Sequence, residues 1–167
     1  MTKDFIFSLT LISTLGSGLM AGVFFAFSVF VMKALARLSP AQGIAAMQSI
    51  NIVVINPWFM SAFLGTAVAC VILLISSAMM GRSPRAAYLF LGSLLYLFGT
   101  VLVTIAFNVP RNDALAAVDP TRTDSAPFWA YYVTSWTHWN HVRTAAALAA
   151  STLLTFALYV PSSHETP

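Results

Sequence analysis

Charged residues are scarce in this sequence. Only 8% of its 167 residues are Asp, Glu, Lys or Arg, whereas an average soluble domain contains roughly 25%. So few charged side chains do not cover the surface of a water-soluble protein of this length, which excludes most soluble folds. Because 59% of the residues are hydrophobic, we expect the chain to lie in a lipid bilayer as one membrane domain, residues 1–167.

Cysteine and clustered basic residues are also lacking. The single cysteine, Cys70, excludes a disulfide within the chain and any cysteine-based zinc motif. The net charge is +3, but the Lys and Arg residues are spread along the chain, so nucleic acid is not an expected partner. The sequence contains no P-loop, GxSxG or HExxH motif, and the enzyme classes that depend on these motifs have no support.

What the sequence does contain is a set of long apolar segments. Residues 5–32, 58–80 and 86–107 include no Asp, Glu, Lys, Arg or His. A fourth apolar run, residues 145–160, needs the preceding turns from residue 138 to cross the hydrocarbon core. A secretory signal is the rival interpretation of the first segment, but the segment far exceeds the usual length of a signal's apolar region. We therefore predict an all-α fold, an integral membrane four-helix bundle with spans at 5–32, 58–80, 86–107 and 138–160.

The charges beside these spans bear on the orientation of the bundle. Four spans place both termini on one side of the membrane. Lys3 and the short basic turn with Arg82 and Arg85 favour cytoplasmic termini, while Lys33 and Arg37 argue the opposite way. We expect a multi-pass protein of a plasma or inner membrane with cytoplasmic termini. The sequence leaves open whether the chain forms a homo-oligomer.

An additional helix is expected between the first two spans. Ser39, Pro40 and Gln42 match an N-cap, a first-turn proline and a capping-box partner. The helix should end before Asn56-Pro57, since the residue before a proline disfavours helical geometry. We interpret it as an amphipathic, interfacial connector, with a substrate lid as the alternative.

The longest polar stretch, residues 108–141, is expected to form a long structured loop between spans 3 and 4. Pro110 should end the third helix, so that Arg111, Asn112 and Asp113 fold over its end. If the fourth helix begins near Trp136, then Trp136, Asn140 and Arg143 share one face. The third helix leaves the membrane where the fourth enters it. Thr104 and Asn108 should therefore meet that face in a polar cup with aromatic walls.

Several residues of this cup have both a functional and a structural interpretation. Arg143 adjoins sixteen apolar residues, a costly position that marks a functional site unless the side chain snorkels to the headgroups. Asn140 suits either a ligand contact or a helix cap, and Asp113 either catalysis or a surface pair with Arg111. His138 and His141 form an HxxH pattern. A metal site there needs a third ligand, for which the candidates are Asp113, Asp119 and Asp124.

At these residues the chain resembles the anthrone oxygenase-like family, which is also catalogued as a domain of unknown function. The resemblance covers nearly the full length, and it rests on segments 22–28, 31–32, 47–51 and 56–57 and on two more specific motifs, Asn108-Val109-Pro110-x-Asn112 and Trp136-x-x-Trp139-Asn140-x-x-Arg143. It implies a small four-helix membrane protein. It further implies an enzyme that converts an anthrone into an anthraquinone with O₂ and with no evident metal or organic cofactor.

The candidate residues suit such chemistry, which needs a base, oxyanion donors and a dry pocket. The expected base is His141 or His138, with Asp113 as second choice. The expected donors to an enolate oxygen or a peroxide are Arg143, Asn140, Asn108 and Asn112. Trp136 and Trp139 are expected to stack on a flat ring, and Arg111 is counted with the substrate-binding residues. The expected partners are lipid, a hydrophobic substrate and O₂.

Two alternatives stay open. The first is a non-catalytic membrane protein that binds a lipid, a quinone or a partner helix in the same pocket. The second is a metal- or haem-assisted oxidoreductase built on His138 and His141.

Overall fold

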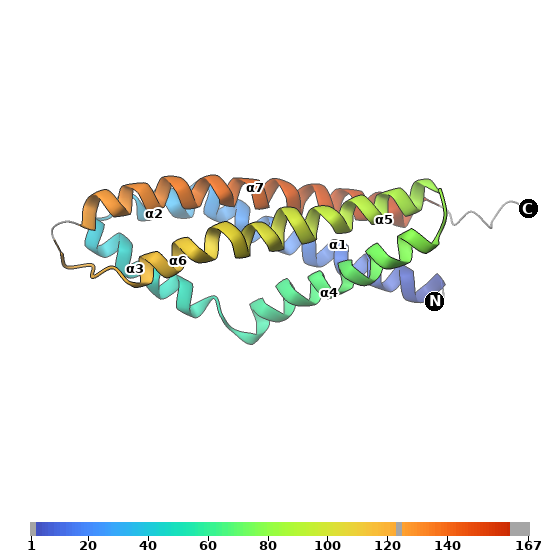
Figure 1. Ribbon diagram of the computed structural model, residues 1–167, viewed down its shortest axis with the longest axis horizontal. Helices are drawn as coiled ribbons and strands as arrows, with labels where there is room; N and C mark the ends of the chain where they lie inside the picture. The colour runs from blue at the N-terminus through green and yellow to red at the C-terminus, as the bar shows by residue number, and fades with distance from the viewer. Residues whose placement is uncertain (1–2, 123–124, 161–167) are drawn as a thin grey trace, which may run out of the picture.

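Four long helices and one shorter helix make up the protein (Figure 1). The computed structural model describes residues 3–122 and 125–160. The first long helix joins α1 (Lys3–Ala26), the π-helical segment η1 (Phe27–Val31) and α2 (Met32–Leu35). After α3 (Pro40–Val53), the second long helix is α4 (Pro57–Met79). The third joins α5 (Pro84–Leu94), η2 (Leu95–Leu102), η3 (Thr104–Asn108) and α6 (Val109–Ala116), and the fourth is α7 (Ser125–Tyr159).

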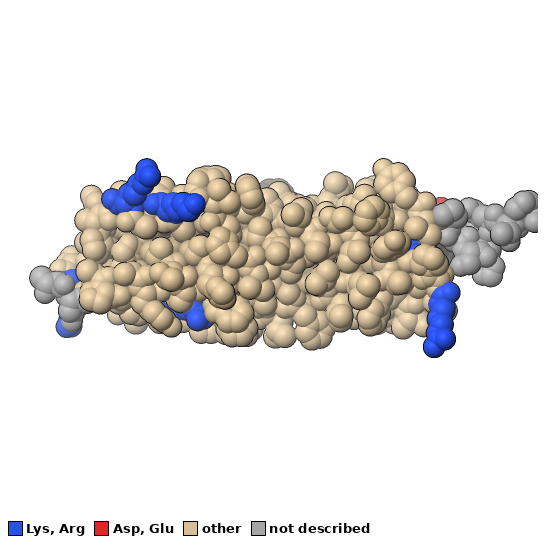
Figure 2. Space-filling model, turned by 90° about the horizontal axis from the view of Figure 1, so that it is seen from above, with Lys and Arg blue, Asp and Glu red and all other residues tan. Residues whose placement is uncertain are grey.

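The four long helices are each long and apolar enough to cross a membrane. Large hydrophobic side chains such as Ile12, Ile75, Phe98 and Leu148 point outward from all four. Lys and Arg gather toward the two ends of the face shown in Figure 2, and its middle lacks charged residues. The protein is thus an all-α, multi-pass membrane bundle, as predicted. The start of α1 and the end of α7 lie at the same end of the bundle (Figure 1).

The extra helix forms where its capping signals predict it. Ser39 Oγ accepts a hydrogen bond from the Gln42 amide, and Gln42 Oε1 accepts one from the Ser39 amide, which completes the capping box. Asn56 then caps α4, because its Oδ1 accepts from the amides of Trp58 and Phe59, both at 3.1 Å. The capping box starts α3, and Asn56 stands at the sharp change of direction between α3 and α4, where its Nδ2 also donates to the Val53 carbonyl at 2.9 Å.

α3 is fixed to the rest of the bundle. Ile44 and Met47 are buried in a cluster with Leu115 of α6 and Trp129 of α7. Gln48 Nε2 donates to the carbonyls of Leu115 and Val118, both at 2.9 Å, and so satisfies the open carbonyl end of α6. The connector is therefore a wall of the bundle near one end.

The prediction that Pro110 ends the third helix is wrong. The helix continues through Pro110 to Ala116. The preceding segment η3 is π-helical, and such wider turns accommodate interruptions of the regular hydrogen-bond ladder. The Arg111 guanidinium donates to the Phe107 carbonyl at 2.7 Å, which supplies a donor in the turn where proline has no N–H.

The fourth helix also begins earlier than predicted. α7 starts at Ser125 rather than near residue 136 or 138. Its first turns are held by buried aromatic side chains, among them Trp129 and Tyr132, which stack with ring centroids 5.7 Å apart. As a result, most of the polar stretch expected to form a long loop between spans 3 and 4 is helical, up to Ala116 and again from Ser125.

Candidate functional site

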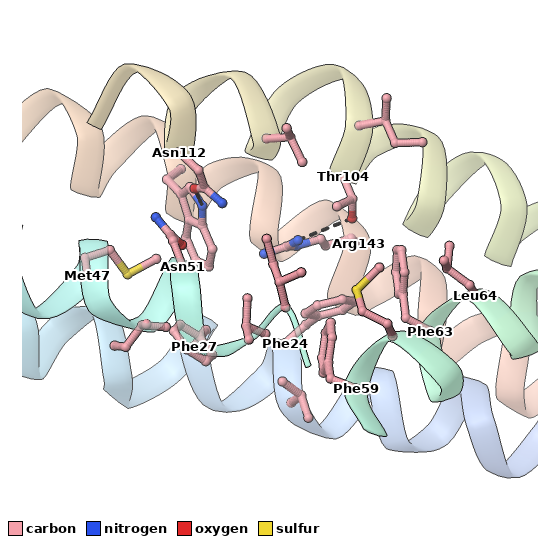
Figure 3. Close-up of a pocket in the computed structure, with 18 residues that line it drawn as sticks. Phe24, Phe27, Met47, Asn51, Phe59, Phe63, Leu64, Thr104, Asn112 and Arg143 are labelled. Atoms are coloured by element: carbon pink, nitrogen blue, oxygen red, sulfur yellow. Dashed lines mark hydrogen bonds between the residues drawn. The ribbon is translucent and has the colours of Figure 1, made fainter. Parts of the chain in front are cut away.

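A cavity of about 310 Å³ lies between α1, α3, α4, the third long helix and α7. Most of its lining is apolar, with Phe24, Phe27, Phe59 and Phe63 among the walls. Four polar residues also line it, namely Asn51, Thr104, Asn112 and Arg143. Figure 3 shows the two asparagines at one end of the cavity, Phe59 and Phe63 at the other, and Arg143 and Thr104 between them. The polar groups and the aromatic side chains therefore face the same cavity.

Arg143 is the ionisable residue at the centre of this cavity, and it is only 6% exposed. Its Nε donates to Asn140 Oδ1 at 2.9 Å, and its Nη1 donates to Thr104 Oγ1 at 3.3 Å. Its guanidinium carbon lies 4.2 Å from the centre of the Phe24 ring and 4.9 Å from that of Trp136. Such cation–π contacts partly replace lost hydration.

The charge of Arg143 has no counter-ion within the described residues. Every partner of the guanidinium there is neutral, and Nη2 donates to no protein acceptor. A buried cation normally pairs with an anion because desolvation is costly. The free Nη2 group and the missing counter-charge together favour an anionic oxygen on a ligand as the partner.

Asn140 holds Arg143 in place. It is fully buried, and its Nδ2 donates to the Phe24 carbonyl at 2.7 Å and to Ser28 Oγ at 2.6 Å. These two donations fix the orientation of the amide, so its Oδ1 faces Arg143. Phe24 lies in the last turn of α1, before the π-helical segment η1, and Ser28 lies within η1. Asn140 thus connects α7 to the first helix and positions the guanidinium.

The other polar end of the cavity presents N–H donors. Asn112 Oδ1 accepts from Tyr132 Oη at 2.9 Å and from Trp136 Nε1 at 2.8 Å. Because both donations go to the oxygen, the amide nitrogen of Asn112 is the group left for a ligand. Asn51 Nδ2 is buried, makes no hydrogen bond within 3.5 Å, and has the Tyr132 side chain as its polar neighbour. An acceptor oxygen bound here would satisfy both amides.

Four of the residues predicted for the polar cup line the cavity: Arg143, Thr104, Asn112 and Trp136. Asn140 lies directly behind Arg143. Asn108 is buried, and its Nδ2 donates to the Trp136 carbonyl at 3.2 Å, so it supports the position of Trp136 from outside the cavity. Trp139 also lies outside, stacked on Phe107 with ring centroids 3.5 Å apart.

The predicted bases are not brought to this cavity. His138 and His141 are exposed and line a separate outer groove with Lys33 and Thr137. Asp113 is exposed on α6, and the Arg111 guanidinium donates to its own helix. Ser28 lines the outer groove but not the cavity, and it is linked to Arg143 only through its hydrogen bond with Asn140.

The carboxylates considered as metal ligands are also dispersed. Across residues 3–122 and 125–160, no three His, Cys, Asp or Glu side chains gather as a metal site. Asp119 accepts hydrogen bonds from the amide and hydroxyl of Thr121, at 2.9 and 2.8 Å, and these bonds lower the pKa of its carboxyl. Asp124 lies outside the described residues.

Sequence reasoning overlooked several residues of the site. Asn51 and Ser28 fall within the segments that carry the family resemblance, but nothing local marks them as ligand contacts. Tyr132, whose hydroxyl orients Asn112, was not among the predicted site residues. Phe59 and Phe63 recur at a four-residue spacing on α4 and stack with centroids 6.1 Å apart, which was the available sign of an aromatic wall.

The cavity can stabilise a negative charge on a ligand, but its described lining residues offer no group suited to abstract a proton. No carboxylate or imidazole is found among the described residues that line it. The Thr104 hydroxyl donates to the Thr100 carbonyl at 2.7 Å and accepts from Arg143, so both of its hydrogen-bonding roles are taken. What remains available to a ligand is a guanidinium, two amide nitrogens and aromatic surfaces.

Comparison with known proteins agrees with this architecture. No curated protein and no solved structure matches the chain. A family model described as anthrone oxygenase matches residues 58–153, more than half of the chain. The matched region runs from the start of α4 into α7, and it contains Thr104, Asn112, Asn140 and Arg143. The chain therefore belongs to the anthrone oxygenase family.

Proposed function

We propose that this protein is a membrane oxygenase that binds the enolate of a flat, hydrophobic aromatic ketone and promotes its reaction with O₂. The observation that carries the proposal is Arg143, a buried guanidinium that faces an apolar, aromatic cavity and has no counter-ion among residues 3–122 and 125–160. Family membership favours anthrone-like substrates and an oxygenation that uses no separate cofactor.

The role of Arg143 is to stabilise negative charge on the substrate. An anthrone-like ketone reacts with O₂ through its electron-rich enolate. A cation in a site of low dielectric constant favours this anion over the neutral ketone and so lowers the pKa of the bound ketone. Asn140 and Thr104 hold the guanidinium in the required position before the ligand arrives.

The reaction is balanced with O₂ as the oxidant. The C–H bond at the enolisable carbon breaks, its electron pair delocalises onto the ketone oxygen beside Arg143, and the proton passes to water. O₂ then adds at that carbon, and the resulting peroxide anion takes a proton back from water to give a hydroperoxide. Loss of water from the hydroperoxide leaves a second carbonyl, so the substrate is converted into a quinone. In this scheme Asn112 and Asn51 are placed to donate to a second oxygen of the substrate.

The size and walls of the cavity suit such a ligand. Its volume of about 310 Å³ lies at the lower end of the roughly 300–1,000 Å³ found for small-molecule pockets. That space favours a compact polycyclic ring system over a ligand with long substituents. Phe24, Phe27 and Trp136 offer rings against which flat aromatic surfaces pack.

Oxygen uptake tests the proposal. We would supply purified, metal-stripped protein with emodin anthrone and compare the rate with spontaneous autoxidation. Loss of a preorganised charge-stabilising group typically lowers the rate by about 10²–10³, and we expect this of Arg143→Gln. Arg111→Gln is the matched control, because Arg111 lies outside the cavity, and it should retain the wild-type rate. Equal rates for wild type, Arg143→Gln and the protein-free control would contradict the proposal.

The second candidate function is binding without catalysis. It is favoured by the lack of a proton acceptor among the described lining residues. In that case a quinone would bind in the cavity of the wild-type protein and bind more weakly to the Arg143→Gln variant. Oxygen uptake would stay at the spontaneous rate in both. Measuring binding and oxygen uptake on the same preparation separates the two functions.

For the location of the protein we propose a plasma or inner membrane with cytoplasmic termini. Lys3, Arg82 and Arg85 support this orientation, and Lys33 and Arg37 oppose it. A C-terminal reporter that is active only in the cytoplasm tests the orientation. An inactive reporter on a correctly inserted protein would show that the termini lie on the opposite side of the membrane.

A further inference from the structure

One side of the cavity is open, and its rim is aliphatic. Four lining residues are strongly exposed, namely Ile55 (72%), Ile105 (59%), Leu64 (47%) and Val109 (41%). Ile55 and Leu64 belong to the α3–α4 junction and α4, and Ile105 and Val109 belong to the third helix. The opening therefore lies between these two parts of the chain.

The course of α4 explains why the bundle opens here. The main contacts of α4 with the third helix are made by α5 and η2, near the end of the bundle where the chain termini lie. Toward its other end, α4 leaves the third helix and meets α3 at the Asn56 cap. In Figure 1 this junction is the part of the chain farthest from α7. Within the part of the chain that the structure describes, α4 does not pack closely against η3 or α6, so the cavity is open between the junction and the segment containing Ile105.

The rim lies at the depth of the apolar spans. Ile105 and Leu64 both fall in runs without Asp, Glu, Lys, Arg or His. Neighbouring residues outside the cavity, such as Ile52, Val53 and Trp58, are also exposed and hydrophobic. A mouth that opened to water would need polar groups around it, whereas an aliphatic rim is compatible with lipid hydrocarbon.

We infer that the ligand of this site is an uncharged aromatic molecule dissolved in the bilayer, which enters sideways between Ile55 and Ile105. This inference rests on the proposed function and deepens it, since it specifies the form in which the substrate arrives. A neutral ketone crosses the aliphatic rim at little cost, whereas an anion does not. The ligand becomes an enolate only beside Arg143, inside the cavity.

The same arrangement explains how a site with a free cation remains selective. Water-soluble anions would pair well with Arg143 if they reached it. They are kept away by a rim that offers no compensation for their lost hydration. The opening selects for neutral molecules, and the guanidinium then selects those that ionise at an oxygen.

The test is to obstruct the opening without touching the polar site. We would substitute Ile105→Trp and measure the rates of binding and release of anthraquinone by protein in lipid nanodiscs. Ile75→Trp is the matched control, because Ile75 is equally exposed (59%) on α4 and does not line the cavity. Val109→Trp is a second obstruction on the same side. Protein folding is checked by the thermal transition of each variant.

The expected result is at least a tenfold slowing of both association and dissociation in Ile105→Trp and Val109→Trp, and wild-type rates in Ile75→Trp. Wild-type rates in both obstructed variants would overturn the lateral route while leaving the proposed function intact. If wild type binds no anthraquinone, the proposed function fails and this inference fails with it.

A charged probe provides an independent test. Anthraquinone-2-sulfonate carries the same rings but is excluded from the hydrocarbon. We expect it to bind at least tenfold more slowly than anthraquinone at equal free concentration in water. Equally fast binding of the sulfonate would show that the cavity is reached from water and would overturn the inference.

Discussion

Arg143 Nε donates a hydrogen bond of 2.9 Å to Asn140 Oδ1, three residues earlier on α7. The amide of Asn140 is oriented by its two donations to the first helix. The direction of the guanidinium is therefore set by a neutral partner, and its positive charge stays available. A carboxylate in the same place would hold Arg143 equally well but would neutralise it.

Asn140→Asp tests whether the charge of Arg143 must stay free. The substitution preserves shape and keeps an acceptor for Arg143, but it places a negative charge 2.9 Å from the guanidinium in wild-type geometry and removes the two donations to Phe24 and Ser28. We predict that oxygen uptake falls by at least about tenfold, since the ion pair cancels the stabilisation of the enolate. The measurement is the oxygen-uptake rate with an anthrone, paired with the thermal transition. A variant that folds normally and keeps the full rate would show that the free charge is not required.

The histidines of the outer groove should be dispensable for the reaction. His138 and His141 line a different space from Arg143. We predict that a His138→Ala, His141→Ala double variant keeps oxygen uptake within about twofold of wild type and keeps the same pH profile, since a general base normally contributes 10²–10⁴-fold. If this variant lost one limb of the pH–rate profile, the result would show that an imidazole acts as the base.

Gln48 should be important for stability. Its two hydrogen bonds of 2.9 Å to the end of α6 hold α3 against the bundle. We predict that Gln48→Ala lowers the free energy of unfolding by about 1–2 kcal/mol, because it leaves two helix-terminal carbonyls without this donor. Denaturant unfolding in detergent measures the change. An unchanged midpoint would mean that water replaces the side chain without loss.

Gly43 marks the closest approach of α3 to α7. A Cβ atom at this position would lie 2.6 Å from the Trp129 ring. We predict that Gly43→Ala destabilises the protein by about 1–3 kcal/mol through overpacking. Gly65→Ala is the control, since a Cβ there meets nothing within 4 Å, and it should be neutral or stabilising by up to about 1 kcal/mol. Equal thermal transitions for the two variants would contradict the predicted packing.

Much of the fold was predictable because its signals are local. The apolar runs define the spans, and Ser39, Gln42 and Asn56 define the ends of α3 and α4 through caps that involve near neighbours. The course of the chain around Pro110 was not predictable in this way. The proline is tolerated where the preceding segment η3 is π-helical, and the Arg111 guanidinium donates to a carbonyl of the same turn, that of Phe107.

The site was predictable in part for a similar reason. Trp136, Asn140 and Arg143 share a face by helical spacing alone. The same spacing, about 100° per residue, places His141 about 200° from Arg143, so the imidazoles could have been assigned to another face before the structure was known. The place of Asn51 in the site could not be predicted from spacing, because Asn51 reaches the cavity only through the packing of α3 against the bundle.

The proposed function requires that Arg143 stabilises an anionic oxygen of a bound aromatic molecule. The most direct measurement uses 2-hydroxyanthraquinone, whose colour reports ionisation of its hydroxyl group. Bound to wild-type protein, its ionisation midpoint should fall by at least about one pH unit relative to the same compound in protein-free nanodiscs, as expected next to an opposite charge. Arg143→Gln should remove this shift while Arg111→Gln retains it. An unshifted or raised midpoint in wild type would contradict the account.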